Sequence, residues 1–377
     1  MRSPFRILAT VALGAAFALP APAFAAVAAH APATGADHAV FVQTDDPAGN
    51  HVVAYHRGAN GALTLAGTYS TGGRGGVLDG SVVDHLASQG SLTYDRDHGL
   101  LFAVNAGSDS VSVFSASGDH LTRRQVIASG GQFPVSVAVH DDLVYVLNAR
   151  DGGVVQGYGL RNGRLIPLRH ARADLGLDST ASPEFVNTPG QVAFSPSGQQ
   201  LVVTTKANGN DVDVFRVGYF GELSAPTVNA LPGAVPFAIA FDHSRHLVLA
   251  EAGTNAVASF ELNHDGTIHA LDSVATGQAA TCWIAGAQGY LFASNAGSGS
   301  ISRVQPAANG ALTLLGATTT DAGTVDAAAS AAGRYLYVQT GASGIVDGFH
   351  VGSDGSLTSV GSVTVASAVG GEGIVAV

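Results

Sequence analysis

Lys206 and Glu251 are the residues of this chain whose types and placement most suggest chemistry. Lys206 is the only lysine beside 16 arginines. Its compact ammonium can bind an anion or stabilise a developing oxyanion. Glu251 can act as a general base toward water. Both stand nine residues before the end of a repeated sequence phrase, so the pair predicts either a catalytic site or a salt bridge between neighbouring repeats.

Further polar residues occupy matching places in the other repeats and form a candidate ring of ligand-binding side chains. Three of them, Asn105, Asn148 and Asn295, precede the turn of their phrase, and Thr44 and Thr340 take the same place in two other repeats. Near the starts of other predicted strands lie Gln191, Asp326 and the single tryptophan, Trp283. For Asp326 the alternative is a solvated strand start, and for Trp283 it is packing between repeats.

The repeated phrase predicts the elements that must position these residues. It consists of an apolar run, a turn of small residues and a second apolar run with alternating polarity, which is typical of two antiparallel strands. Its clearest copies are residues 101–114, 201–215, 247–260, 291–304 and 336–349, with weaker copies at 40–55 and 144–158. Seven repeats of this size and content predict a seven-bladed β-propeller, an all-β fold.

Shorter apolar runs before and after each phrase predict a first and a fourth strand for every blade. The first repeat has no preceding run, but residues 373–377 (GIVAV) resemble the first strands elsewhere, such as SVAV at 136–139. We therefore expect this C-terminal strand to join the first blade and close the ring, which removes exposed sheet edges. Two long insertions, near 74–89 and 173–188, fall between blades. They are expected on the same face as the turns inside the phrase, which we take as the functional face.

The N-terminus is typical of an export signal. Arg2 and Arg6 precede the apolar run 7–19, and Ala23-Phe24-Ala25 forms a small-x-small cleavage pattern. We expect a signal peptide over 1–25, a flexible leader over 26–38 and the propeller over 39–377, with a membrane anchor as the alternative for the first segment. Export predicts a periplasmic or extracellular protein with no membrane span after cleavage.

Composition narrows the possible partners. The formal net charge is −11, which disfavours nucleic-acid binding. Cys282 is the only cysteine and is expected to be a small buried residue. His243 and His246 lack a cysteine or carboxylate at metal-ligand spacing, and no phosphate-binding glycine loop is present. We therefore expect no metal and no cofactor, and a small molecule, a lactone or an anion, as the substrate or ligand. The oligomeric state is left open.

The repeats resemble the seven-bladed β-propeller lactonase family, whose members include 6-phosphogluconolactonases and carboxymuconate lactonizing enzymes. The resemblance covers essentially the whole predicted mature chain and rests on residues 188–215, 235–260 and 290–304. It implies that Glu251 matches the glutamate of the family's Asn-Glu phrase and that Lys206 matches its basic residue. The family's His-Pro-His or Arg-His is replaced here by Pro189-Gly190-Gln191 and Pro236-Phe237-Ala238.

Two functions follow from these residues. The first is an exported hydrolase that opens a small lactone, with Glu251 as the base and Lys206 polarising the carbonyl. The second is a non-catalytic propeller that binds a small anion or a protein on the same face, from which a purely structural envelope protein is hard to separate. The missing histidine favours binding, whereas Lys206 and Glu251 favour chemistry.

Overall fold

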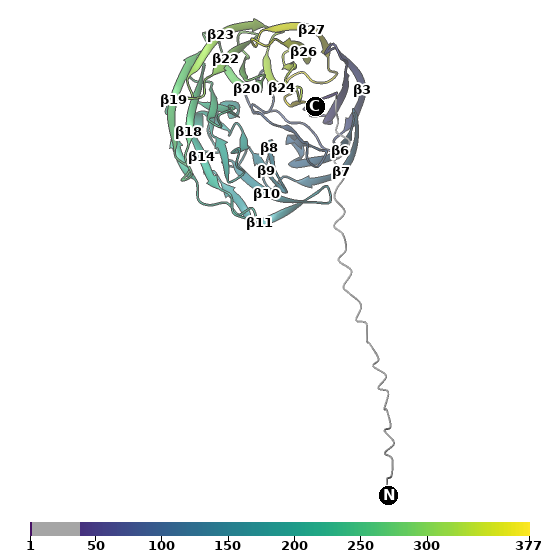
Figure 1. The fold of residues 1–377 in the computed structure, drawn as a ribbon, viewed down its shortest axis with the longest axis vertical. Helices are drawn as coiled ribbons and strands as arrows, with labels where there is room; N and C mark the ends of the chain where they lie inside the picture. The colour runs from purple at the N-terminus through teal and green to yellow at the C-terminus, as the bar shows by residue number, and fades with distance from the viewer. Residues whose placement is uncertain (2–37) are drawn as a thin grey trace. The chain divides into compact units, whose positions relative to one another are not determined.

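The computed structural model describes Met1 and residues 38–377, and the latter form seven four-stranded antiparallel sheets arranged in a ring (Figure 1). Apart from Met1 and His38, the predicted signal peptide and leader lie outside the described residues. From the axis outward, the first blade contains β28 (Ile374–Ala376), β1 (Ala39–Gln43), β2 (His51–Arg57) and β3 (Leu63–Ser70), and the second contains β4 (Leu92–Asp95), β5 (Leu100–Asn105), β6 (Ser110–Ser117) and β7 (His120–Ala128). The third blade contains β8 (Pro134–His140), β9 (Leu143–Asn148), β10 (Val154–Arg161) and β11 (Arg164–Asp174), the fourth contains β12 (Val192–Phe194), β13 (Gln200–Thr204), β14 (Asp211–Arg216) and β15 (Thr227–Ala230), and the fifth contains β16 (Pro236–Phe241), β17 (Leu247–Glu251), β18 (Ala256–Leu262) and β19 (Ile268–Ala275). The sixth blade contains β20 (Thr281–Ala287), β21 (Tyr290–Asn295), β22 (Ser300–Pro306) and β23 (Leu312–Thr319), and the seventh contains β24 (Thr324–Ala329), β25 (Tyr335–Thr340), β26 (Ile345–Val351) and β27 (Leu357–Thr364). The predicted seven-bladed propeller is confirmed.

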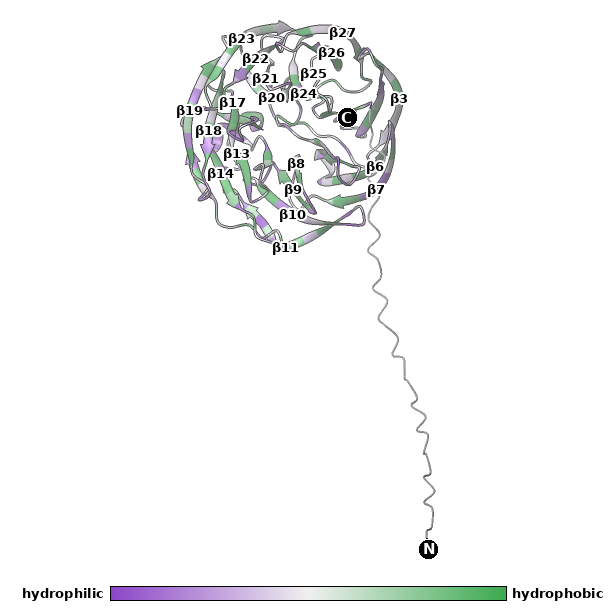
Figure 2. Cartoon of the chain, in the orientation of Figure 1, coloured by the Kyte–Doolittle hydropathy of each residue, from purple (hydrophilic) through white to green (hydrophobic). Residues whose placement is uncertain are grey.

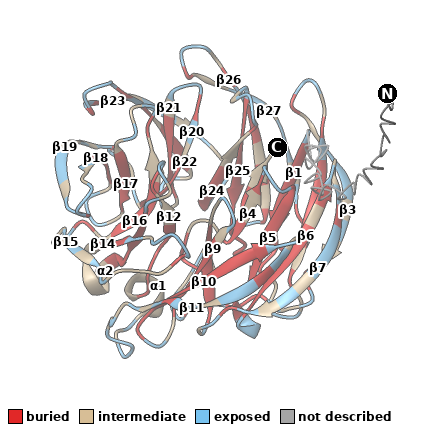
Figure 3. Cartoon of the chain, turned by 60° about the horizontal axis from the view of Figure 1, so that its bottom comes forward, coloured by how far each residue is buried: buried red, intermediate tan, exposed pale blue. Residues whose placement is uncertain are grey.

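Burial explains why the repeated phrase was so easy to recognise. Its first run becomes the second strand of a blade, such as β5 or β25, in which every residue is buried between neighbouring sheets. The fourth strands face solvent, so exposed and half-buried positions dominate β3 and β19. Figure 3 shows this gradient from red inner strands to pale outer ones, and Figure 2 shows mixed hydropathy along the outer strands. Apolar side chains on both faces of an inner strand are what a doubly covered sheet requires.

The ring closes as expected from the C-terminal sequence. Strand β28 pairs antiparallel with β1, with Val40 opposite Ala376 and Val42 opposite Ile374. The Val377 backbone N–H donates to Ala39 O at 2.9 Å, and the guanidinium of the buried Arg57 donates to Val377 O at 3.0 Å. The last residues of the chain therefore cover an edge of β1 that would otherwise be open.

Helical segments are short and lie in turns or links on the functional face. They are the 3-10 turn η1 (Ala106–Ser108) and the single turns α1 (Glu184–Asn187) and α2 (Lys206–Gly209). No helix in the described part of the chain has the length and apolar character needed to cross a bilayer.

Candidate functional site

The mouth of the central channel is filled by the protein's own chain. Residues 77–90, named the plug here, belong to the link between β3 and β4, and Leu78 and Leu86 within it are fully buried. Figure 1 shows this blue-purple segment crossing the inside of the ring toward β20 and β24. Its hydrogen bonds reach blades on opposite sides: Ser88 Oγ donates to Val135 O, Gln89 N to Gly190 O, Gln89 Nε2 to Ile284 O and His85 N to Gly370 O. The plug therefore connects the third, fourth and sixth blades with the link that leads to the last strand.

Lys206 donates a hydrogen bond directly to the plug. Its ammonium donates to Ala87 O of the plug at 2.6 Å, to Phe185 O at 2.6 Å and to Thr188 Oγ1 at 3.1 Å. These three bonds use all three donors of an ammonium group. Only 1% of the residue is exposed, and this burial lowers the pKa of Lys206 to about 7, with the nearby Asp84 carboxylate opposing the shift. Lys206 thus joins both insertions to the fourth blade.

Counting nine residues back from the end of the phrase aligned Lys206 with Asn105 and Glu251, one position before its true place in the repeat. Asn105 and Glu251 are the last residues of β5 and β17, whereas β13 already ends at Thr204 and Lys206 opens the turn α2. The repeat 201–215 contains one extra residue, so counting backward from Phe215 shifts the alignment by one. Lys206 therefore has a left-handed backbone, with φ of 52°, rather than a strand-end conformation.

Glu251 and Lys206 are not ion-paired. In residues 38–377, no salt bridge within 4.0 Å includes either side chain. Glu251 Oε2 accepts a bond from Thr254 Oγ1 at 3.0 Å, and burial raises the pKa of Glu251. The ammonium of Lys206 lies instead 5.3 Å from the ring centre of Phe237, whose neighbour Pro236 is the strand partner of Glu251. The expected salt bridge between repeats is therefore wrong.

Four buried carboxyl groups in and beside the plug influence one another's charge and are named the axial carboxyls here: Asp45, Asp84, Asp326 and Glu372. Burial raises the pKa of Asp45 to about 8, of Asp326 to about 7 and of Asp84 to about 6. The pKa of Glu372 is also raised, first by burial and then by the negative charges of its three neighbours. Each group accepts backbone N–H bonds, for example Glu372 from Gly90 at 3.0 Å and Asp84 from Leu86 at 2.8 Å. They anchor the plug and the last link.

The expected ring of asparagines braces the blades from within. Asn105 Nδ2 donates to Ser112 Oγ at 2.9 Å, and Asn295 Nδ2 donates to Ser302 Oγ at 2.9 Å in the equivalent place. Asn148 Nδ2 donates to Ser129 O at 3.2 Å. All three asparagines are completely buried. The matching spacing of Asn105 and Asn295 therefore places the same asparagine-to-serine bond in two blades.

The remaining predicted site residues also bond within the protein. Gln191 Oε1 accepts from the Ile239 backbone N–H at 2.6 Å, which joins the fourth blade to the fifth. Trp283 donates its indole N–H to Ser88 O at 2.6 Å and packs against Phe237, with ring centres 4.9 Å apart. Asp326 is 4% exposed, so the alternative of a solvated strand start is wrong.

The structure also describes the environment of Cys282 and the distribution of potential metal ligands. Cys282 is buried beside Trp283, as expected, and burial raises the pKa of its thiol. Across residues 38–377, His, Cys, Asp and Glu side chains form no group of three that could hold a metal ion.

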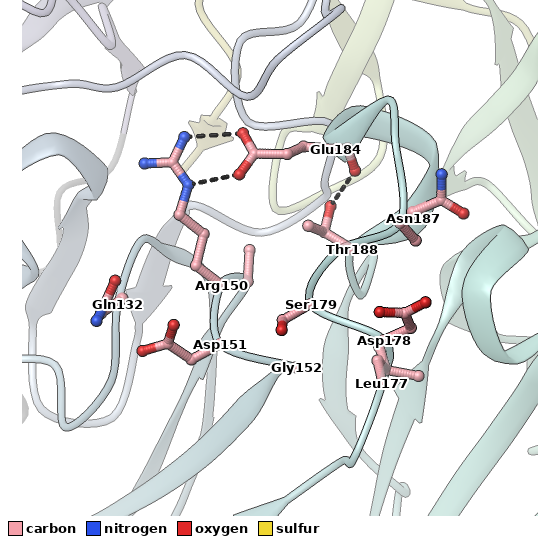
Figure 4. A pocket seen from close by; sticks show the side chains of 12 residues that line it. Gln132, Arg150, Asp151, Gly152, Leu177, Asp178, Ser179, Glu184, Asn187 and Thr188 are labelled. Atoms are coloured by element: carbon pink, nitrogen blue, oxygen red, sulfur yellow. Dashed lines mark hydrogen bonds and ion pairs between the residues drawn. The ribbon is translucent and has the colours of Figure 1, made fainter.

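An open pocket lies on the functional face beside the third blade (Figure 4). It has a volume of about 170 Å³ and joins a second, wider pocket through the shared residues Gln132 and Asp151. The turn between β9 and β10 forms one wall, and the long link between β11 and β12 forms the other. We name the two pockets together the Arg150 groove.

A bidentate ion pair fixes the inner wall of this groove. Arg150 Nε and NH2 each donate to a different oxygen of Glu184 at 2.8 Å, as the dashed lines of Figure 4 show. The guanidinium stacks over the Phe133 ring at 4.4 Å, and the bond to Arg150 lowers the pKa of Glu184. Glu184 Oε2 also accepts from the Asp79 backbone N–H at 2.9 Å. The same pair therefore holds the plug in place and shapes the groove.

Other groove side chains remain free for a ligand. Gln132, Asp151 and Ser179 are exposed, and no side-chain hydrogen bond to another described residue is found for them. Asp178 is exposed too, and its Oδ1 is held by Thr180. Further carboxylates line the second pocket, namely Asp109 and Asp174, with Arg172 bound to the latter. The groove is consequently rich in hydrogen-bond acceptors and negatively charged.

Sequence reasoning missed both the groove and most of the axial carboxyls. The long insertion near 173–188 was the only signal for the groove, because Asp151 and Asp178 resemble ordinary turn residues. Asp45 also resembles a turn residue in the sequence, but it is completely buried.

Comparison with models of protein families and with curated protein sequences finds no match. Solved structures do share the fold. A Bacteroides fragilis protein provisionally described as a 6-phosphogluconolactonase has a TM-score of 0.70 at 16% identity, covering 90% of this chain and 98% of that one. The periplasmic gluconolactonase of Pseudomonas aeruginosa has a TM-score of 0.69 at 18% identity, covering 89% and 98%.

A catalytically inactive virginiamycin B lyase from Staphylococcus aureus has a TM-score of 0.53 at 16% identity, covering 71% of this chain and 82% of that one. The chain thus has the seven-bladed fold of lactonase-like propellers, as the sequence resemblance predicted. Because propellers with other activities match too, the fold by itself does not define the reaction.

Proposed function

We propose that this protein is an exported, lactonase-type propeller that binds a neutral, hydroxyl-rich small molecule, such as a sugar or a sugar lactone, in the Arg150 groove. One observation carries the choice of site. The plug closes the axial mouth, and the ammonium of Lys206 is saturated by Ala87, Phe185 and Thr188. The groove instead offers free polar side chains to solvent on the same face.

The polar groups of the groove favour a donor-rich ligand over an anion. The carboxylates of Asp151 and Asp178 accept hydrogen bonds from hydroxyl groups, and the amide of Gln132 can both donate and accept. Arg150, the cation of the inner wall, is already paired with Glu184. An anionic ligand would meet Asp109, Asp151, Asp174 and Asp178 without a free counter-charge. The anion expected from Lys206 is therefore not the ligand we propose here.

The class of ligand and the location draw support from two further observations. A propeller of the same fold acts as a periplasmic gluconolactonase, a name that implies a sugar lactone. The first 25 residues of this chain have the pattern of an export signal. A periplasmic or extracellular protein meets free sugars and their oxidation products.

Calorimetric titration with neutral sugars, sugar lactones and the corresponding sugar acids tests the proposal. At least one neutral sugar or lactone should bind, and its open acid should bind at least about tenfold more weakly, a difference of about 1.4 kcal/mol. The double variant D151N/D178N should lose binding by a similar factor, and S179W should block the groove. Glu261→Gln, on the exposed side of β18, is the matched control. Binding that ignores both groove variants, or no binding of any neutral compound, would overturn the proposal.

Lactone hydrolysis at the axis is the second candidate. The observation in its favour is that burial moves the pKa of Lys206 down to about 7 and that of Glu251 upward, as acid–base catalysis near neutral pH requires. This reaction needs the plug to leave the mouth. Turnover above the spontaneous rate that falls by about 10²-fold or more in folded E251Q would support it. Turnover unchanged in E251Q would remove Glu251 from any mechanism.

A further inference from the structure

The opposite face of the propeller carries an exposed aromatic pair on its longest turn between third and fourth strands. Residues 217–226 join β14 to β15, and Tyr219 and Phe220 within them are 92% and 71% exposed. In residues 38–377, they are the only aromatic side chains among the exposed large hydrophobic residues. Their rings meet edge to face, with centres 4.9 Å apart. Such exposed apolar groups mark interaction sites on soluble proteins.

Hydrogen bonds within the turn and to the third blade hold the backbone that carries this aromatic pair. Gly218 N donates to Glu222 O at 2.8 Å, and Gly221 N donates to Gly218 O at 2.9 Å. Gly221 has a φ of 83°, and a Cβ there would come within 2.8 Å of the Leu168 side chain. Tyr145 in the third blade donates its hydroxyl to Gly221 O at 2.6 Å. Exposure of the two rings is therefore built into the fold.

Unpaired cations surround the aromatic pair, although the whole chain is acidic. Leu223 N donates to His170 O, so the turn lies against β11, which exposes Ile166, Arg169 and His170. Arg216 lies at the base of the turn and is exposed. Neither Arg169 nor Arg216 takes part in a salt bridge within the described residues.

Glu222 on the same turn adds one negative charge beside these cations, whereas Asp142 is paired with an arginine. Glu222 Oε2 accepts from the Phe220 N–H at 3.2 Å, and Asp142 pairs with Arg161 at 2.9 Å. The patch formed by Ile166, Arg169, His170, Arg216, Tyr219 and Phe220 is named the rim patch.

We propose that the rim patch docks the protein on the surface of an anionic phospholipid membrane. Tyrosine and phenylalanine suit the boundary between lipid headgroups and acyl chains. Arginines beside them can bind lipid phosphates, and each basic residue adds to the attraction of an anionic surface. The pair stands on a projecting turn, and its residues line neither pocket of the Arg150 groove. An apolar tip with cations beside it can insert into a flat, deformable lipid surface. A polymer strand would instead require a groove on the protein.

Vesicle co-sedimentation tests the docking. The protein is purified after export, and all variants share one N-terminus, so any contribution of residues 1–37 cancels. Wild type should sediment with phosphatidylcholine vesicles that contain about one-third phosphatidylglycerol, but not with pure phosphatidylcholine. Binding should weaken with added salt because ions screen the charges. The variants Y219S/F220S and R169E/R216E should each weaken it at least tenfold.

Two matched variants control for lost apolar surface and for reversed charge. L65S/V126S removes exposed apolar side chains from other outer strands, and R96E/R245E makes the same charge change elsewhere. Both should bind vesicles like wild type, and all variants should melt near the wild-type temperature. In F220W, indole emission should shift to the blue on vesicle addition, which reports insertion directly.

Four results would overturn the proposal. The first is absence of wild-type binding to anionic vesicles at low salt, and the second is equal binding by the rim variants and their controls. The third is a dimer, seen by sedimentation velocity, that Y219S/F220S dissociates while vesicles bind nothing. Binding to dextran sulfate alone would likewise assign the rim patch to a soluble polyanion. None of these results bears on ligand binding in the Arg150 groove, because the two surfaces lie on opposite faces.

Discussion

The propeller axis and the Arg150 groove both collect charged side chains on the same face, but these side chains are used in opposite ways. At the axis, Lys206 and the four axial carboxyls are buried, and their hydrogen bonds join them to the protein's own backbone and side chains. In the groove, Asp151 and Gln132 are exposed and form no side-chain hydrogen bond within the described residues, although Arg150 and Arg172 are paired with Glu184 and Asp174. Charge alone therefore does not indicate a binding site. What distinguishes one is a polar group that the fold leaves without a partner.

Removal of residues 373–377 should have the largest effect, because it acts on the axial region as a whole. The truncation removes β28, exposes the edge of β1 and takes away Val377, which is 1% exposed and accepts from Arg57. We expect a loss of about 5 kcal/mol or more, which is comparable with the whole stability of many domains. Urea unfolding of truncated and full-length protein measures it. Addition of the GIVAV peptide in trans should restore part of the loss, and equal midpoints for both proteins would contradict ring closure.

Lys206→Met should destabilise the fold by about 3–5 kcal/mol, the cost of breaking a buried charged network. Methionine keeps most of the volume but leaves Ala87 O and Phe185 O without their donor and leaves Asp84 without its nearby cation. In the groove, Asp151→Asn should change the unfolding free energy by less than about 0.5 kcal/mol. Denaturant midpoints of both variants compare the two regions directly. A near-neutral K206M would mean that the axial network adds nothing to the fold.

Stability should fall as the pH rises from about 4 to about 8. The axial carboxyls have raised pKa values in the folded protein, about 7 for Asp326 and about 8 for Asp45, against the ordinary aspartate pKa of 3.8. The folded state therefore keeps protons that the unfolded chain releases in this range, which lowers the unfolding free energy by a few kcal/mol. Lys206 acts in the opposite sense between pH about 7 and 10.5, because its pKa is lowered and the folded state loses its proton first.

Melting temperatures across pH 4 to 9 measure this profile. Asp326→Asn should flatten the decline between pH 4 and 7, and Glu261→Gln, which removes an exposed carboxylate from β18, controls for the change in net charge. An unchanged slope in D326N would exclude Asp326 as a source of the pH dependence.

Breaking the Arg150–Glu184 pair should affect stability less than the changes at the axis. The two side chains are 38% and 31% exposed, so solvent screens them and a contribution of about 1 kcal/mol is expected. A double-mutant cycle with Arg150→Met and Glu184→Gln measures the coupling. Glu184→Gln should also loosen the plug at Asp79, which hydrogen exchange of the plug amides can detect. Coupling well above the expected value would show that the groove wall is as rigid as the axis.

The sequence by itself determined the number of blades, the strand pairs and the ring closure. Strand alternation, small-residue turns and their spacing are local properties, so the repeats from 101–114 to 336–349 and the tail 373–377 contain them in full. Lys206 and Glu251 could be chosen as charged residues at matching places, but their partners could not be read from that pattern.

Only the tertiary structure decided which polar residues remain free. The insertion at 74–89 could have extended into solvent or folded across the axis. Its position depends on bonds to Lys206, Trp283 and Glu372, which are more than 100 residues away in the sequence. The exposed Asp151 and the buried Asp45 resemble each other as turn residues, and folding separates them by burial alone. The physical reason is that a hydrogen-bond partner is chosen by proximity in space, whereas a strand is specified by its own alternation of side chains.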